Sequence, residues 1–511
     1  MSISAGHGIR FVFTLGGLVL LGGCAAGPNF HRPAAPAVKG YTPEPLAART
    51  AQAEVAGGEA QRFVQGLDIP GQWWRLFHSR PLNTLIEEAL KANPSLASAQ
   101  AALRVARENA LAQKGAYYPT LETSFAPSYN KTATGSLSAA SASGNPYYSL
   151  YTGQLTVSYT PDVFGLNRRT VESLEAQAEA QRFQLEATYL TLTSNVVAAA
   201  VQEALLRGQI KATQEIIRVE TEALEILRHQ LALGQIAGAD VAVQEAALAQ
   251  AQASLPPLQK QLAQQRDLIA ALAGRFPSEQ PSEKFDLDGM RLPQELPVTL
   301  PAKLVEQRPD VGAAEAQLHS ASAQIGVAVA NRLPNITLSP NGGYAANVLS
   351  QLFGPGNSYW SLAGTLTQPI FEGGALLHRE RAARAAYDDA LAQYRSTVIT
   401  AFQNVADALR ALQSDAKALT AAVAAERAAA TTLSITQRQL ELGQVAYLLF
   451  INAEQTYQQA IVSLVQARAN RYADTAALFQ ALGGGWWNRS DLASAAISAK
   501  NGQPSRKPAT E

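Results

Sequence analysis

The sequence predicts an α+β chain with an internal duplication, in which each half is a helix, two strands, a long helix, a tight turn and a second helix. Residues 166–233 contain no proline and one glycine, and residues 375–442 contain neither. At about 1.5 Å per residue, each stretch can form a helix roughly 100 Å long. The first stretch ends in QLALGQIA and the second in QLELGQVA. A shared ending after two stretches of equal length indicates a repeat.

The first long stretch carries two rows of apolar or small residues, one starting at Val171 and the other at Ala176. Each row recurs every seven residues, and the rows lie about 140° apart on a helix. A two-stranded coiled coil has one seam, so two rows indicate a helix with neighbours on both sides, as in the wall of a cylinder. The face from Glu172 to Glu186 is charged and the opposite face, which includes Ser173, is polar, so both are predicted to face water. A bundle helix with one charged face is the alternative interpretation.

Composition argues against several functions. Lys+Arg and Asp+Glu are equal at 41 each, so no net positive charge attracts nucleic acid. Cys24 is the only cysteine, which excludes an internal disulfide and a multi-cysteine metal site. The six histidines form no two-histidine zinc motif, and no glycine loop suits a phosphate. The sequence therefore predicts neither an enzyme nor a bound metal or cofactor.

The first residues have the pattern of a signal peptide. A charged start ending at Arg10 precedes an apolar segment, and small residues then lead to Cys24. This pattern predicts a lipoprotein signal peptide over residues 1–23 and acylation of Cys24, with palmitate among its lipids. Ala25, in place of an aspartate, favours transport to the outer membrane. The alternative is a buried free cysteine after an ordinary signal peptide.

Five further segments are predicted in chain order. An extended N-terminal segment over residues 24–80 is rich in alanine and proline and is not expected to form a core. The first repeat occupies residues 81–275, and a proline-rich linker over residues 276–300 leads to the second repeat at residues 301–485. A polar tail at residues 486–511 is predicted to be disordered.

Within the first repeat, the helix over residues 81–114 is interrupted or starts again at Asn93-Pro94-Ser95. The return helix after the tight turn starts at Val241, is capped by Asp240, and is broken or bent at Pro256 and Pro257.

Strands are predicted in pairs, over residues 121–129 with 148–159 and over residues 336–344 with 359–367. After the first 21 residues no apolar run reaches the roughly 20 residues of a membrane-spanning helix. Four strands cannot close a membrane barrel, because the smallest have about eight. Three chains would supply twelve.

Several short motifs, in this order and spacing, resemble the TolC family of outer-membrane factors, and most of all the acylated branch that serves multidrug efflux. The resemblance covers almost all of the chain from Cys24 to Trp487. The matching motifs are Gly23-Cys24 with Gly27-Pro28-Asn29-Phe30 and Pro33, Asp162-Val163-Phe164-Gly165 with Arg168-Arg169, Pro369-Ile370-Phe371 with Gly373-Gly374, and Ala481-Leu482-Gly483-Gly484-Gly485-Trp486.

The resemblance implies a homotrimer with a 12-stranded outer-membrane β-barrel, continued by a long periplasmic α-helical barrel. It implies an exit duct that passively conducts small molecules from an inner-membrane pump, of the resistance-nodulation-division class, through a periplasmic adaptor protein. The adaptor would dock on the two helical tips, at Gly234, Gln235, Asp240, Gly443 and Gln444. Type I protein secretion uses the same fold and is one alternative. A structural lipoprotein that only bridges the envelope is another, although a spacer needs no strands.

The gate is predicted from a departure from the family pattern. The family often places carboxylates six and nine residues after the second tip glycine, where this chain has Leu449 and Asn452. Residues 447–451 around them are apolar, so we expect an apolar constriction to close the duct. Asp240 is the remaining acidic candidate, and the sequence favours a helix cap over the lumen for its side chain.

Overall fold

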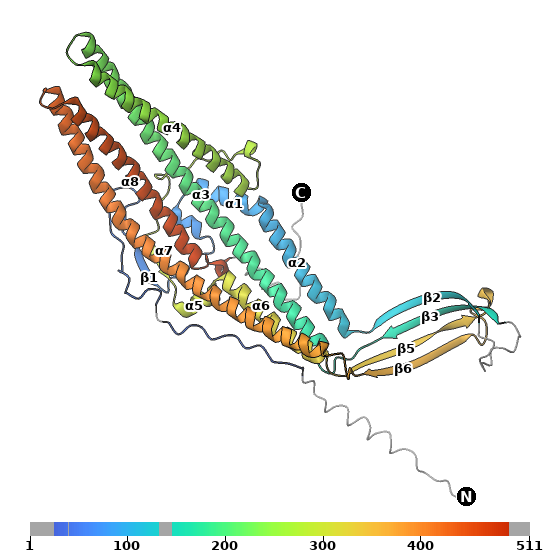
Figure 1. Cartoon of the computed structure of the whole chain (residues 1–511). Coiled ribbons are helices and arrows are strands. Elements are labelled where there is room, and N and C mark those ends of the chain that lie inside the picture. The colour runs from blue at the N-terminus through green and yellow to red at the C-terminus, as the bar shows by residue number, and fades with distance from the viewer. Residues whose placement is uncertain (1–24, 39, 132–145, 490–511) are drawn as a thin grey trace, which may run out of the picture. The chain divides into compact units, whose positions relative to one another are not determined.

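The computed structural model describes residues 25–38, 40–131 and 146–489. Its two longest helices are α3 (Leu166–Ala232) and α7 (Ala375–Glu441), as Figure 1 shows. Both end within a residue of the predicted limits. Of the helices in the described ranges, none is long and apolar enough to cross a membrane.

The two halves of the chain have the same order of elements. Each contains a broken helix, two strands, a long helix and a return helix, so the predicted α+β duplication is confirmed. The helices of the first half are α1 (Arg80–Ala92), α2 (Pro94–Lys114) and α4 (Gly238–Leu272). Those of the second half are α5 (Pro301–Gln307), α6 (Pro309–Ala330) and α8 (Tyr447–Ala481).

The chain divides into two compact units, and each takes segments from both repeats. Of the described residues, those within Leu103–Ala180 and Ala314–Gln393 belong to the first unit, together with residues 25–32. The other described residues form the second unit, which includes both helix-to-helix turns. The repeats of the sequence are therefore not the compact units of the fold.

The first unit contains an antiparallel sheet in the order β2-β3-β5-β6. One face of the sheet carries large apolar side chains and the other is mainly polar, because residues alternate along each strand. On edge strand β2, for example, exposed Leu121 and Phe125 alternate with Glu122 and Ser124. The strands are β2 (Thr120–Lys131), β3 (Tyr147–Ser158), β5 (Asn335–Ala346) and β6 (Ser358–Thr367), which confirms the four predicted strands.

The predicted N-terminal segment and linker are more structured than expected. A parallel pair of short strands joins them, β1 (Arg62–Gln65) with β4 (Glu295–Val298). Apolar side chains from both segments are buried in the second unit, so neither is a surface-only connection. These side chains are Ala53, Ile69, Phe285, Leu287, Met290 and Leu292.

The prediction of a disordered tail is wrong for residues 486–488. Residues Trp486–Asn488 form a short 3₁₀ helix, and the Trp486 indole N–H donates to the Gln307 carbonyl at 2.7 Å. Residues 490–511 lie outside the described residues.

The charged and polar faces of α3 are not exposed to solvent along their whole length, contrary to the prediction. Glu186 is only 1% exposed and forms an ion pair with Arg489 at 2.7 Å. Ser173 is also buried, and its hydroxyl lies 2.8 Å from that of Ser320. Each finds its partner in a segment more than a hundred residues away, which the helix pattern alone cannot show.

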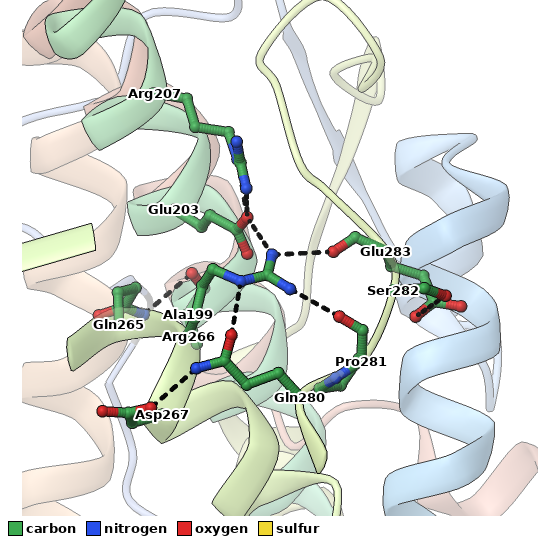
Figure 2. Close-up of polar contacts among 10 residues, drawn as sticks. All are labelled: Ala199, Glu203, Arg207, Gln265, Arg266, Asp267, Gln280, Pro281, Ser282 and Glu283. Carbon is green, nitrogen blue, oxygen red and sulfur yellow. Dashed lines mark hydrogen bonds and ion pairs between the residues drawn. The ribbon is translucent and has the colours of Figure 1, made fainter. Parts of the chain in front are cut away.

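A buried ion-pair cluster fixes the segment that was predicted as a linker (Figure 2). Arg266 on α4 donates to the buried Glu203 on α3 at 3.0 Å and to the carbonyl of Pro281 at 2.6 Å. Its Nε also donates to the Gln280 side chain at 3.0 Å. A second cation, Arg207, pairs with Glu203 at 2.7 Å. One guanidinium therefore joins α3, α4 and the connection between the repeats.

Of the predicted break or bend in the return helix, the break is wrong, because α4 continues through Pro256 and Pro257. The bend stays a prediction. Proline has a helix-compatible φ but cannot donate the backbone hydrogen bond. Both prolines are exposed, so water can replace the two missing donors, and the helix is not interrupted.

Candidate functional site

The two helix-to-helix turns of the second unit have the same backbone structure. Gly234 has φ +74° and Gly443 has φ +67°, values that side-chain-bearing residues rarely adopt. The next residue donates back into the helix, with Gln235 N to the Gln230 carbonyl at 3.0 Å and Gln444 N to the Gln439 carbonyl at 2.9 Å. These are the bonds of a Schellman motif, in which glycine ends the helix. The repeated tip sequence is thus a repeated C-cap.

Neither turn is covered by another part of the described chain. A Cβ atom added to either tip glycine would meet no atom within 4 Å, and Gln235 and Gln444 are exposed. Four of the predicted docking residues, Gly234, Gln235, Gly443 and Gln444, therefore lie on accessible loops. The loops are at the ends of the hairpins α3–α4 and α7–α8 (Figure 1).

Asp240 does not cap α4, so the capping prediction is wrong. The helix starts at Gly238, its N-cap is Ala237, and no side chain makes a cap hydrogen bond. Asp240 is the third helical residue, where a carboxylate interacts favourably with the helix dipole. Its side chain lines a cavity between the two hairpins.

The apolar run after the second turn is divided by helical periodicity. Phe450 and Ile451 are buried, whereas Leu449 is 50% exposed and Asn452 is exposed. The two gate candidates thus share an outward face of α8 in the single chain. Their part in a gate stays a prediction.

A buried polar network near the tips was not predicted from the sequence. Glu220 on α3 is 2% exposed. It accepts from Gln458 at 3.0 Å and from Gln244, which in turn accepts from the Tyr447 hydroxyl. The network joins α3, α4 and α8, and so connects the two hairpins.

Glu454 lies beside this network and was also missed. It is 3% exposed, and its Oε2 atom has no hydrogen-bond partner. Burial, and then the nearby charge of Glu220, raise the pKa of Glu454 to about 7. A signal was present in the sequence, because Glu454 follows Phe450 and Ile451 by four and three residues and so shares their buried face.

Cys24 lies outside the described residues, but the chain just after it is held tightly in the first unit. The Ala26 amide donates to the Phe164 carbonyl at 2.9 Å. Buried Arg169 donates to the Ala26 carbonyl at 3.0 Å and to the Asn29 side chain at 2.8 Å. Asn29 and Arg169, which come from two different motifs of the family resemblance, therefore bind one another.

Glu172 adds to these contacts between Arg169 and residues 26–29, which we call the N-terminal anchor. It accepts from Arg169 at 2.7 Å and lies 3.0 Å from His319, whose ring stacks on Phe30 at 4.4 Å. Burial would raise the pKa of Glu172, but the hydrogen bonds from Arg169 and His319 outweigh it and lower the pKa overall. The anchor therefore holds a charged carboxylate. Across the described ranges, no three His, Cys, Asp or Glu side chains gather so as to hold a metal ion.

The fold is that of an outer-membrane channel. It matches the solved structure of the outer-membrane channel OprN with a TM-score of 0.81 at 26% identity, covering 91% of this chain and all of that one. The chain is 27% identical over 483 residues to a probable efflux pump outer membrane protein, TtgC, of Pseudomonas putida, covering 94% of this chain and 96% of TtgC. It is 28% identical over 477 residues to the outer membrane protein OprJ of Pseudomonas aeruginosa, covering 91% and 94%.

The chain belongs to the outer membrane efflux protein family, whose model matches residues 85–275 and 300–484. The family predicted from the sequence is thus confirmed, and with it an efflux function in the outer membrane. Proteins of this family are efflux channels and not enzymes.

Proposed function

We propose that this chain forms, as a homotrimer, the outer-membrane exit duct of a tripartite efflux system. It conducts small molecules passively from an inner-membrane pump of the resistance-nodulation-division class, through a periplasmic adaptor protein, to the cell exterior. Cys24 carries its lipid, and the duct uses no other cofactor and performs no catalysis. The exposed tip turns at Gly234 and Gly443 dock the adaptor.

The sheet of the first unit is the observation that carries the proposal. Its outer strands β2 and β6 have no partner on their free edges within the described chain. The strands contain 10 to 12 residues, so each is long enough for a membrane-spanning strand of roughly 9–11 residues. Exposed Trp360, Leu362 and Leu366 give β6 an apolar face like that of β2. Pairing β6 of one chain with β2 of the next would remove every free edge and close three sheets into a 12-stranded barrel.

Conductance in planar bilayers tests the duct directly. Purified trimers should form discrete, ion-conducting pores. Absence of any pore would overturn the duct and leave a structural lipoprotein as the better proposal. Copurification with an adaptor of a protein secretion system, without effect on drug susceptibility, would favour type I secretion.

The lipid anchor is expected to be secondary to the sheet. Cys24→Ser, expressed with a signal peptide that is cleaved by the ordinary route, should still give membrane-inserted trimers. A barrel without free strand edges stays inserted in the membrane without the lipid. Membrane fractionation and native gels measure this. A variant recovered only as a soluble periplasmic monomer would show that the acyl chains are required.

The gate without carboxylates should resist block by trivalent cations from the periplasmic side. Leu449 and Asn452 replace the acidic residues that would bind such ions, so Asn452→Asp should introduce a block that the wild type lacks. Single-channel recordings with and without the cation measure it. Strong block of the wild type that Asp240→Asn abolishes would instead place an acidic ring at Asp240.

A further inference from the structure

A cavity of about 570 Å³ lies between the two helical hairpins, near their tips. We call it the tip cavity. Its volume falls within the roughly 300–1,000 Å³ of small-molecule sites. All of its lining residues belong to the second unit, on α3, α4, α7, α8 and the first tip turn.

The walls of the tip cavity are mainly apolar, with two aromatic rings among them. Tyr447 and Phe450 lie with ring centroids 5.8 Å apart, and both line the cavity. Aromatic faces attract cations, and quaternary ammonium groups most typically. The larger aliphatic side chains of the wall are Val219, Ile226, Leu227, Ile236, Leu433 and Leu440.

Every charged residue that lines the cavity is acidic, and no Lys, Arg or His side chain lines it. Glu222 is paired with Arg218, and Glu441 with Arg438. For the other two acids, Asp240 and Glu454, the described part of the chain shows no ion pair. The cavity therefore combines apolar walls with an excess of negative charge.

Glu454 is the acid that most needs a partner. Its Oε2 atom is buried and receives no hydrogen bond, and the buried Glu220 carboxylate lies close enough to interact with it electrostatically. Ionising a buried carboxyl group without a counter-ion is costly. A cation in the cavity would supply that counter-ion.

We propose that the tip cavity binds an organic cation with aromatic or aliphatic groups around its charged centre, and that Glu454 is the counter-ion. The apolar walls receive the substituents, the Tyr447 and Phe450 rings face the cation, and Asp240 adds negative charge at the side of α4. This inference does not depend on the duct, because binding is measured without transport.

Tetraphenylphosphonium and tetraphenylborate are suitable probes, because they have nearly the same shape and opposite charge. Equilibrium dialysis of the full-length trimer in detergent should show saturable binding of the phosphonium and only unsaturable partitioning of the borate. Saturable binding of both ions alike would mean that the cavity recognises shape alone, and would overturn the role of Glu454.

Glu454→Gln should weaken phosphonium binding by roughly tenfold or more, since it removes a buried charge partner. The matched control is Glu225→Gln, an exposed acid on α3 that does not line the cavity, and it should bind like the wild type. Ala223→Trp should abolish binding by filling the cavity without a change of charge. It provides an independent test if Glu454→Gln fails to assemble.

The affinity should rise with pH, because a cation binds the ionised form of Glu454. With a pKa of about 7 for Glu454, phosphonium should bind about tenfold more weakly at pH 6 than at pH 8. This difference should disappear in Glu454→Gln. The titratable groups that surround the Glu454 side chain or line the cavity with it are Glu220 and Glu222 on α3, Asp240 on α4, Glu441 on α7 and Tyr447 on α8.

Three further results would overturn the proposal. They are the absence of saturable phosphonium binding to the wild type, unchanged affinity in both Glu454→Gln and Ala223→Trp, and a wild-type affinity that does not depend on pH. A pore in bilayers together with any of these would leave the duct intact and refute only the tip cavity.

Discussion

Valine in place of Gly234 or Gly443 is expected to reduce drug resistance to the level of a strain that lacks the protein, while trimers still assemble. Both glycines have positive φ, at +74° and +67°, and a β-branched residue there is a strained outlier. Because an added Cβ would meet no neighbour within 4 Å, the effect would come from the backbone. The turn would lose its shape, and the hairpin end would tilt away from the adaptor.

Asparagine at the same positions is the matched control, since it tolerates a left-handed backbone better than any β-branched residue. Gly234→Asn and Gly443→Asn should keep most of the resistance. Minimum inhibitory concentrations, with trimer levels checked on native gels, measure both pairs. Full resistance in the valine variants would remove the tips from the docking surface, and equal loss in the asparagine variants would point to a need for glycine beyond its φ.

Arg471→Met is expected to destabilise the second unit by about 3 kcal/mol, because it leaves buried acceptors without a donor. Arg471 is fully buried on α8. Its guanidinium donates to the carbonyls of Gly57 and Glu59, each at 2.9 Å, and to the Gln61 side chain at 3.0 Å. Methionine fills similar space but donates nothing, so the N-terminal segment around these residues should detach.

Limited trypsin digestion measures the detachment, because Arg49 and Arg62 flank the segment and are exposed. Cleavage there should become much faster in Arg471→Met. Arg427→Met is the control. Arg427 contacts the same segment through an exposed ion pair with Glu54 at 3.1 Å, and such surface pairs contribute about 1 kcal/mol or less. Equal cleavage rates in the two variants would show that Arg471 does not hold the segment.

Contacts between residues that are distant in the sequence could not be predicted from the sequence. The segment at residues 276–300 looks like a linker because it is rich in proline, yet Phe285 and Met290 are buried and Arg266 binds the Pro281 carbonyl. No local pattern connects Arg266 with Glu203 or Arg471 with Gly57, because each pair is joined by chain folding and not by spacing. The sequence predicts Asp240 as a cap because aspartate is a good cap in general, but the helix starts at Gly238, three residues before the predicted start at Val241.

The sequence by itself determined the duplication, the two long helices, the four strands of the sheet and the glycine turns. These features depend on local chemistry: the absence of proline over long stretches, residue alternation and the φ freedom of glycine, all of which act within a few residues. Only the tertiary structure decided that Glu186, Glu220 and Glu454 are buried, and that Glu454 lines a cavity. A carboxylate on a helix is exposed or buried according to what packs against that face, and here the packing partners come from distant parts of the chain.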